Sequence, residues 1–249
     1  MQKEISITAV CHAGSEVLYP AAGGHSIYYF IKRSVDILLA GSLLLLLLPF
    51  MALIAAAIYI YSPGPILFVQ QRVGTKRIRL GDNYYWVRAT FPFYKFRTML
   101  TNVDCTLHKN YVQALIRNDQ QKMAEIQGQE TKVRKLVNDP RITRPGRLLR
   151  RFSIDELPQL WNVLRGDMSM IGPRPAIPYE LEAYKPWHFH RFEAQPGITG
   201  LQQVTARCIA DFDEQVKLDL EYVAHQSLWL DLKIALRTPL AIVSGRGAR

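Results

Sequence analysis

Two adjacent carboxylates, Asp155 and Glu156, stand in the most arginine-rich part of the chain. The tetrapeptide that begins at Ser153 has the form of a capping box, in which the serine caps a helix and the acid three residues later reaches back to it. Apolar residues at helical spacing follow, so we expect a short helix from Ser153 to Gly166. Adjacent helical residues point about 100° apart. The two carboxylates are therefore expected to serve different purposes, one as a nucleophile and the other as a metal ligand.

Arginine side chains surround this acidic pair along the chain. A guanidinium group is planar and permanently charged, and it matches the oxygen atoms of a phosphate group, often with two hydrogen bonds. Carboxylates among such groups favour phosphoryl transfer, in which a carboxylate attacks phosphorus or binds a metal. The simpler alternative is that the acids only cap a helix and that the arginines form a solvated or lipid-facing surface. The arginines are Arg141, Arg144, Arg147, Arg150, Arg151 and Arg174.

Size and charge narrow the class of protein. The chain has 249 residues, 49% of them hydrophobic, which suffices for one domain or for one domain with a membrane anchor. The net charge of +10 indicates an anionic partner, which is nucleic acid, anionic lipid or a phosphorylated substrate. Cys11, Cys105 and Cys208 are an odd number and far apart, so they support neither a disulfide framework nor a zinc site. A reducing, cytoplasmic environment fits the soluble part.

An uncharged, apolar run extends from Ile37 to Ile60. It is long enough to cross about 30 Å of hydrocarbon, so we expect residues 31–61 to form a membrane-embedded helix. Positive residues flank both ends of the run, and such residues prefer the cytoplasmic side. Pro49 lies near the middle and supplies a cause for a bend, because it removes a backbone N–H. A kinked, re-entrant helix that returns to the cytoplasm is favoured, and a full crossing is the alternative.

The fold expected for the whole chain is α+β and mainly helical. Residues 1–30 lack a cleavable apolar core and are interpreted as a leader that is poorly ordered or lies on a surface. Residues 62–240 are expected to form a cytoplasmic domain, and residues 101–138, which are polar with sparse apolar positions, a helical insertion in it. Residues 241–249 have the composition of a frayed tail.

A small strand element is predicted after the apolar helix. Short strands are expected at residues 66–74 and 84–89, and residues 91–99 alternate aromatic and polar side chains. Alternation places Lys95 and Arg97 on one face of a strand. These two basic residues then either bind a substrate or simply line a half-buried strand edge.

The second half of the chain carries weaker signals. Residues 178–192 mix aromatic rings with cations, a combination that suits a lipid headgroup layer or an ordinary helix and loop. His188 and His190 lack metal-ligand spacing and are interpreted as surface residues. Residues 195–204 form a glycine-punctuated loop whose N–H groups can approach phosphate. Residues 228–237 have the pattern of an amphipathic helix in the membrane interface.

Several ordered motifs resemble the bacterial sugar transferase family, that is, the monotopic polyprenyl-phosphate glycosyl-1-phosphate transferases in their compact form. The resemblance covers about residues 30 to 240 and depends on a long central motif. The matching segments are Lys32-Arg33 before the helix with Pro49, Tyr94-Lys-Phe-Arg-Thr-Met99, Asp139-Pro-Arg-Ile-Thr-Arg144, the run from Ser153 to Pro175, Pro196-Gly-Ile-Thr-Gly200 and Leu230-Asp-Leu-Lys-Ile234.

The resemblance implies an enzyme that moves a sugar 1-phosphate from a UDP-sugar to undecaprenyl phosphate and releases UMP. It implies a place at the cytoplasmic face of the inner membrane, at the first membrane step of exopolysaccharide, O-antigen, capsule or glycoprotein glycan assembly. The partners expected are the UDP-sugar, undecaprenyl phosphate and membrane lipid, with a homodimer possible and no nucleic acid. The cofactor expected is Mg²⁺.

The resemblance also implies roles for residues. Asp155 matches the covalent nucleophile and Glu156 the Mg²⁺ ligand, while Arg150 and Arg174 match phosphate-binding positions and Lys95 a supporting one. Together with the basic residues singled out above, the expected substrate-binding set is Lys95, Arg97, Arg147, Arg150, Arg174 and Arg207.

The chain departs from the family pattern at two places near the expected site. Gln195 stands where the family usually has arginine before the proline, and Leu201 stands where it usually has tryptophan. Two alternatives to the enzyme are an inactive family member that scaffolds a glycan assembly complex and a membrane-tethered nucleic-acid-binding protein. The second leaves the two acids among the arginines unexplained, because carboxylates repel a phosphodiester backbone.

Overall fold

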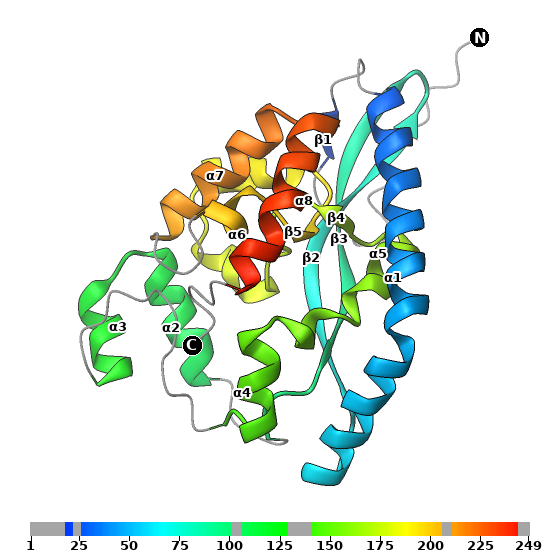
Figure 1. Cartoon of the computed structure of the whole chain (residues 1–249). Helices are drawn as coiled ribbons and strands as arrows, with labels where there is room; N and C mark the ends of the chain where they lie inside the picture. Colours follow the sequence, from blue (N-terminus) through cyan, green and yellow to red (C-terminus); the bar gives the residue numbers. More distant parts are fainter. Residues whose placement is uncertain (1–17, 22–25, 101–105, 129–140, 206–210, 244–249) are drawn as a thin grey trace.

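The computed structural model describes residues 18–21, 26–100, 106–128, 141–205 and 211–243. In this part of the chain, helices surround two sheets, so the expected α+β class is confirmed (Figure 1). The first sheet contains two long strands and one short one, and the second contains two strands of three residues each. Of the active-site candidates, Asp155 and Glu156 lie on a short 3₁₀ helix, and Lys95 lies on one of the long strands.

The long strands β2 (Leu67–Leu80) and β3 (Asn83–Phe96) form one antiparallel hairpin. Their register pairs Leu80 with Asn83 across a two-residue turn, and Gly81 in that turn has a φ of +63°, a value that glycine adopts without strain. The short strand β1 (Leu18–Ala21) pairs with β3, which gives the strand order β1-β3-β2. The three short strands expected from the sequence are thus two long ones, because the basic and polar residues between the apolar segments continue the pairing.

Strands β4 (Ser169–Ile171) and β5 (Gly197–Thr199) form a parallel pair that the sequence did not predict. The two backbones approach closely next to Gly172, whose N–H donates to the carbonyl of Thr199 at 2.9 Å. An added Cβ at Gly172 would overlap the carbonyl oxygen of Gln195. The segment 195–204, expected to be a glycine-punctuated loop, therefore contains strand β5 and then the first four residues of a short helix, α6 (Leu201–Thr205).

Helix α1 (Ser26–Tyr61) is one uninterrupted helix with Pro49 inside it. It begins five residues before the expected boundary at residue 31, so that boundary and the leader assignment of residues 26–30 are wrong. Strand β1 also lies within the expected leader. Figure 1 shows the last part of α1 running at an angle to the first part, without a return of the chain along itself.

Helix α1 follows the hairpin along its length. Near the start of the helix, the rings of Tyr29 and Trp86 lie edge to face with centroids 5.4 Å apart. Ala40, in the middle, belongs to the same core cluster as Phe91. Near the end of the helix, Ile58 packs in the cluster that contains Phe96. Both ends of α1 therefore contact one and the same strand, β3.

The other side of α1 is apolar and exposed. Only 11% of its most apolar window is buried, so α1 is not the core helix of an ordinary soluble protein, and its length and hydropathy would allow it to cross a membrane. Helix α8 (Leu228–Val243) also carries exposed apolar residues at helical spacing, among them Trp229, Leu232 and Leu236. The exposed apolar residues of α1 include Ile31, Leu38, Leu45, Leu53 and Ile60.

The remaining helices complete the domain. Helices α2 (Thr106–Ile116) and α3 (Gln120–Gln127) lie within the expected helical insertion. Helices α6 (Leu201–Thr205) and α7 (Phe212–Ala224) precede α8, and α7 contacts the 3₁₀ segment η6 (Pro186–Glu193). Residues 244–249 of the expected tail lie outside the described residues, and α8 continues into its first part, to Val243.

His188 corrects one expectation directly. Its side chain is fully buried rather than on the surface, while the side chain of His190 is 61% exposed, as expected. The Nδ1 atom of His188 accepts a hydrogen bond from the Lys185 N–H at 3.1 Å, and Nε2 lies 3.0 Å from an oxygen of Asp213. The partner carboxylate is 25 residues away, so local spacing could not reveal it.

Candidate active site

The two carboxylates lie on a tight turn rather than on the expected capping box. Helix α4 (Arg144–Arg151) ends at Phe152, and Ser153 adopts a left-handed conformation with a φ of +56°. The short 3₁₀ helix η4 (Ile154–Glu156) follows, and Ser153 makes no side-chain capping hydrogen bond to it. The expected helix from Ser153 is therefore wrong in its first turn. Non-glycine residues with positive φ are uncommon and cluster at functional sites.

Helix α5 (Gln159–Arg165) holds this turn against β3. The Asn162 amide donates to the Pro92 carbonyl at 2.7 Å, and its oxygen accepts the Tyr94 N–H at 3.2 Å. Asn162 is completely buried, so these bonds fix the distance between α5 and the strand. The helix ends at Gly166, as expected, in a left-handed conformation with a φ of +81°.

Lys95 on β3 faces the acidic pair. Its Nζ atom lies 3.0 Å from Glu156 Oε1 and 3.9 Å from Asp155 Oδ2. Asp155 is buried, with 7% of its surface exposed, and Glu156 is half-buried. One cation thus lies between the two carboxylates, and it comes from a strand 60 residues earlier in the chain.

Burial and neighbouring charges act against each other in this cluster. Burial raises the pKa of the Asp155 carboxyl, and the anion of Glu156 raises it further, whereas Lys95 and Arg150 lower it. Burial likewise lowers the pKa of Lys95, and the two carboxylates oppose that shift. Desolvated charges that compensate one another are typical of functional sites.

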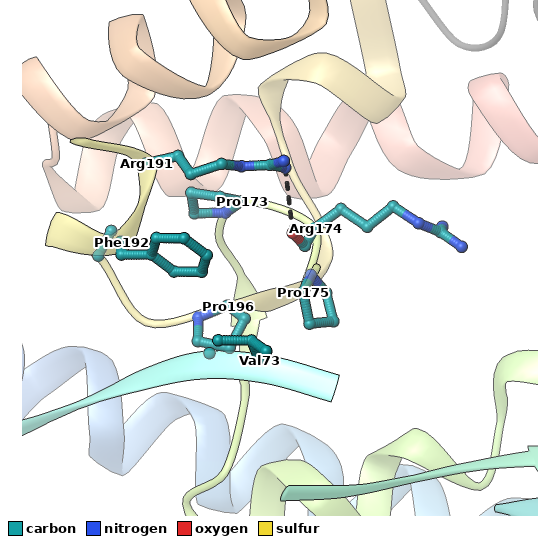
Figure 2. Close-up of a pocket in the computed structure, with 9 residues that line it drawn as sticks. Val73, Pro173, Arg174, Pro175, Arg191, Phe192 and Pro196 are labelled. Carbon is teal, nitrogen blue, oxygen red and sulfur yellow. Dashed lines mark hydrogen bonds between the residues drawn. The ribbon is translucent and has the colours of Figure 1, made fainter. Parts of the chain in front are cut away.

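Arg174 approaches Glu156 from a second direction. Its Nη1 atom lies 3.9 Å from Glu156 Oε1, and its backbone carbonyl accepts a hydrogen bond from Arg191 at 3.1 Å. Figure 2 shows this bond and shows the Arg174 side chain extending away from Arg191. The crevice behind the turn, between Phe192 and Pro196, measures about 10 Å³, the lower limit for one water molecule. The turn that carries Arg174 is therefore tightly packed from behind.

The structure brings together four of the expected site residues and places others elsewhere. Asp155, Glu156, Lys95 and Arg174 lie in one cluster, and Arg150 is near enough to influence Asp155. Arg97 is not in this cluster, because its guanidinium donates to the carbonyls of Ser62 and Pro63 just after α1. Arg147 is exposed on α4, and Arg207 lies outside the described residues.

Arg72 is a residue of this cluster that the sequence reading missed. It lies on β2, is 7% exposed, and donates a hydrogen bond to the Pro175 carbonyl at 3.2 Å. Its charge acts on Lys95 and on Arg174. Arg72 lies between Gln71 and Val73 in the segment expected to be a strand, and a cation within that strand was the available signal.

The basic start of α1 contacts the same elements. Arg33 donates to the carbonyls of Val163 and Leu164 at 2.6 and 2.8 Å, in the last turn of α5. Asp36 accepts the N–H of Met170 on β4 at 2.9 Å. Helix α1 is thus hydrogen-bonded to the last turn of α5 and to β4, two elements that follow the carboxylates in the chain.

A metal site made of protein ligands alone is not found among the described residues, since no three Asp, Glu, His or Cys side chains come together there. Mg²⁺ is commonly held by one or two carboxylates, with phosphate oxygens of a substrate and water completing its octahedron. Asp155 and Glu156 are hard oxygen donors of that number. The residues present therefore fit Mg²⁺ only together with a phosphorylated ligand.

A cavity of about 120 Å³ lies on another side of the Arg174 turn. Residues of α2, α6 and α7 line it, including the ring of Phe212 and the amide of Gln202. Cavities of about 150 Å³ hold a six-membered ring such as benzene. The protein therefore offers space for part of an organic ligand beside the charged cluster.

Comparisons with known proteins match most of the chain. The bacterial sugar transferase family matches residues 27–245. "Undecaprenyl-phosphate galactose phosphotransferase" of Salmonella typhimurium is 39% identical and is matched over 88% of this chain and 42% of its own length. The UDP-N-acetylgalactosamine-undecaprenyl-phosphate N-acetylgalactosaminephosphotransferase of Aeromonas hydrophila is 36% identical over 90% of this chain and 46% of its own.

Exopolysaccharide production protein ExoY of Rhizobium meliloti is 36% identical over 87% of either chain. The chain thus spans less than half the length of the Salmonella and Aeromonas relatives and most of the length of ExoY. The family match extends from the start of α1 past the end of α8 and includes every residue of the acidic and basic cluster. The chain belongs to the bacterial sugar transferase family.

Proposed function

We propose that the protein transfers a sugar 1-phosphate from a UDP-sugar to undecaprenyl phosphate and releases UMP. The observation that carries the proposal is the buried Asp155 beside Glu156, with Lys95 and Arg174 within 4 Å of one or both carboxylates. Two acids surrounded by cations suit a substrate with a diphosphate group. Relatives named as undecaprenyl-phosphate galactose, glucose and N-acetylgalactosamine phosphotransferases support the same reaction class.

Asp155 is the nucleophile in this proposal. One of its oxygens attacks the β-phosphorus of the UDP-sugar, the bond from that phosphorus to the bridging oxygen breaks, and UMP leaves. The product is a phosphosugar-aspartyl intermediate. An oxygen of the lipid phosphate then attacks the same phosphorus, and the Asp155 carboxylate is released unchanged. Because Asp155 is buried, water has little access to the intermediate, which favours transfer to the lipid over hydrolysis.

The other residues of the cluster bind and orient. Lys95 contacts both carboxylates and keeps their mutual repulsion low before the donor arrives. Arg174 lies where it can neutralise a phosphate oxygen next to Glu156. Glu156 would hold Mg²⁺ together with donor oxygens, and the ion would supply charge neutralisation for the diphosphate and for the leaving UMP.

We also propose that the protein acts at the inner membrane, with the catalytic domain on the cytoplasmic face. The exposed apolar sides of α1 and α8 support contact with lipid. Both ends of α1 contact β3, so a helix that crossed the bilayer would carry the hairpin and its charged residues with it. This arrangement favours a helix that enters one leaflet and keeps both ends on the cytoplasmic side.

The reaction is tested with the full chain in detergent, Mg²⁺, undecaprenyl phosphate and a panel of UDP-sugars. We expect UMP release with at least one donor, and a phosphosugar adduct on Asp155 in mass spectra when the lipid is omitted. Asp155→Asn abolishes both, whereas Asp82→Asn, an exposed carboxylate in the hairpin turn, changes neither. An adduct on another residue, or undiminished UMP release by Asp155→Asn, contradicts the nucleophile assignment. Absence of UMP release with every donor favours the scaffold alternative.

The topology is tested with single cysteines at Ile27 and Tyr61, which are 77% and 53% exposed at the two ends of α1. The three native cysteines are replaced first. In intact cells, a membrane-impermeant maleimide in the periplasm is expected to label neither position. Labelling of one end alone means that α1 crosses the membrane.

A further inference from the structure

Two buried arginines hold the turn that carries Arg174. Arg191 donates to the carbonyl of Arg174 at 3.1 Å, and Arg72 donates to the next carbonyl, that of Pro175, at 3.2 Å. Both side chains are 7% exposed. Arg191 and Arg72 thus make the same kind of hydrogen bond, each to the backbone carbonyl of one of two consecutive residues, so their roles can be compared directly.

Arg191 and Arg72 differ in whether a carboxylate contacts the guanidinium group and neutralises its charge. Arg191 forms an ion pair of 2.6 Å with the buried carboxylate of Asp219 and also donates to the Tyr184 hydroxyl at 2.8 Å. Arg72 has no carboxylate within ion-pair distance among the described residues, and its Nε atom has no hydrogen-bond partner there. Its guanidinium instead lies over the ring of Phe93, with the carbon 5.1 Å from the ring centroid. Arg72 therefore has no carboxylate in direct contact among the described residues, and Glu180 and Glu156 act on its charge only from beyond ion-pair distance.

This charge persists at neutral pH. Burial lowers the pKa of Arg72 to about 10, and the adjacent cation of Arg174 lowers it as well, while the carboxylates of Glu180 and Glu156 oppose the shift. That value still leaves the group protonated at neutral pH. A buried cation without a counter-ion is unfavourable by itself, because the interior replaces water poorly. Such a residue is retained at a cost in stability, and an anionic ligand would offset that cost.

The cations of the cluster outnumber its carboxylates. Lys95, Arg150, Arg174 and Arg72 supply four positive charges, while Asp155, Glu156 and the more distant Glu180 supply three negative charges among the described residues. Positive charge thus exceeds negative charge by one in this group, and an anionic ligand such as the diphosphate of a nucleotide sugar would offset the excess.

We propose that Arg72 supplies the buried positive charge of the donor-diphosphate site, acting from behind Arg174, whereas the neutralised Arg191–Asp219 pair only fixes the turn. The inference rests on the proposed function, since it assigns a further residue to the same donor. Arg72 is a positioning and charge-supplying residue in this scheme. It does not touch the reacting phosphorus.

The test separates the charge of Arg72 from its hydrogen bond. Arg72→Lys keeps the charge, and Arg72→Gln keeps a donor near the Pro175 carbonyl but is neutral. Arg191→Lys and Arg191→Gln are the matched controls on the neighbouring carbonyl. Affinities for UDP and for UMP, in Mg²⁺ and detergent, are measured by calorimetry on the full chain, together with the thermal unfolding temperature of each variant.

We expect Arg72→Gln to weaken UDP binding at least about tenfold, equivalent to 1.4 kcal/mol, and to weaken UMP binding less, because UMP lacks the β-phosphate. Arg72→Lys should stay within about threefold of the wild type on the same scale. The two Arg191 variants should lower the unfolding temperature and affect both ligands alike. Arg72→Met serves as a second neutral variant if the glutamine form does not fold.

Equal UDP affinity in Arg72→Gln, Arg72→Met and Arg72→Lys overturns the proposal and leaves Arg72 a structural residue. The wild type distinguishes this failure from a failure of the proposed function. If the wild type releases UMP from a UDP-sugar, the reaction stands whatever the Arg72 variants do. If it neither binds UDP nor releases UMP, the proposed function itself is wrong and the assignment of Arg72 falls with it.

Discussion

Lys32 and Asp231 form an ion pair with 2.9 Å between Nζ and Oδ2, although 199 residues separate them in the chain. Their side chains are only 9% and 11% exposed. The same carboxylate accepts hydrogen bonds from the hydroxyl groups of Tyr28 and Tyr222, at 3.0 and 2.8 Å. This buried network joins the first turns of α1 to the first turn of α8, the two helices with exposed apolar faces.

We therefore expect Lys32→Met to lower the free energy of unfolding by about 3 kcal/mol, because it leaves a buried carboxylate without its cation. The double variant Lys32→Met/Asp231→Leu should lose less than the sum of the two single variants. Thermal unfolding in detergent measures both effects. Arg79→Met, which breaks an exposed pair with Asp82, is the control and should change little. Additive losses would show that the pair does not stabilise the junction.

Lys95 offers a prediction for the rate. Removal of the cation that contacts both carboxylates should lower kcat for UMP release by about 100-fold, the usual effect of deleting one preorganised electrostatic contact. The expected order of kcat is wild type, Lys95→Arg, Lys95→Met. Lys76→Met is the matched control, because Lys76 is also a hairpin lysine but pairs with Asp167, at 2.8 Å. Wild-type kcat in Lys95→Met would remove Lys95 from the catalytic cluster.

His188 makes the stability depend on pH. Burial lowers its pKa, and the hydrogen bond and charge of Asp213 oppose this shift only in part, while the cations of Lys185 and Arg191 add to it. A second proton would also have no acceptor at Nδ1, which already accepts the Lys185 N–H. The unfolded chain binds that proton below about pH 6.5, and the folded chain binds it only at a lower pH. The stabilisation is thus complete above that pH and is lost as the pH falls.

The measurement for His188 is the unfolding temperature between pH 7.5 and pH 5.5, in buffers of equal ionic strength. The wild type should lose stability across this range, and His188→Gln should show a flatter dependence from a lower starting value. His190→Gln, at a position 61% exposed, should follow the wild type. An unchanged slope in His188→Gln would assign the pH dependence to other groups.

His188 also shows where sequence reasoning reached its limit. Local spacing identified the acidic pair, the end of α5 at Gly166 and the apolar α1, because each depends on residues close together in the chain. The partners of His188 and the start of α1 depend on contacts across the fold. Tyr28 and Tyr29, for example, bond to Asp231 and Gln226, about 200 residues away, so the helix extends into the segment expected to be a leader.

The basic residues of the site also divide into those that a motif identified and those whose place depends on contacts across the fold. Lys95 and Arg97 were expected on one face of a strand, yet β3 ends at Phe96, and Arg97 turns to the carbonyls after α1. The motif resemblance placed Lys95 and Arg174 near Asp155, which composition alone could not do. Arg72 was not identified because its partner carbonyl belongs to Pro175, 103 residues later.

Gly172 gives the last prediction, because it fixes the position of the Arg174 turn. It directly follows β4, and an added Cβ would overlap the Gln195 carbonyl oxygen and lie 2.9 Å from the Gly197 N atom. Gly172→Ala must therefore push β5 away from β4 or shift the turn that begins at Pro173. We expect a loss of about 1–3 kcal/mol in unfolding free energy, typical of overpacking, and a larger relative loss in kcat for UMP release, since Arg174 moves away from Glu156.

Gly41→Ala is the matched control for this change. Gly41 lies inside α1, and the nearest atom to an added Cβ there is Leu164 Cδ2 at 4.0 Å, an ordinary contact distance. Alanine is a better helix former than glycine by about 1 kcal/mol, so this variant should unfold at the same or a higher temperature and keep wild-type kcat. If Gly172→Ala behaved like Gly41→Ala, the close approach of β4 and β5 could relax without cost, and Arg174 would owe its position to Arg72 and Arg191 alone.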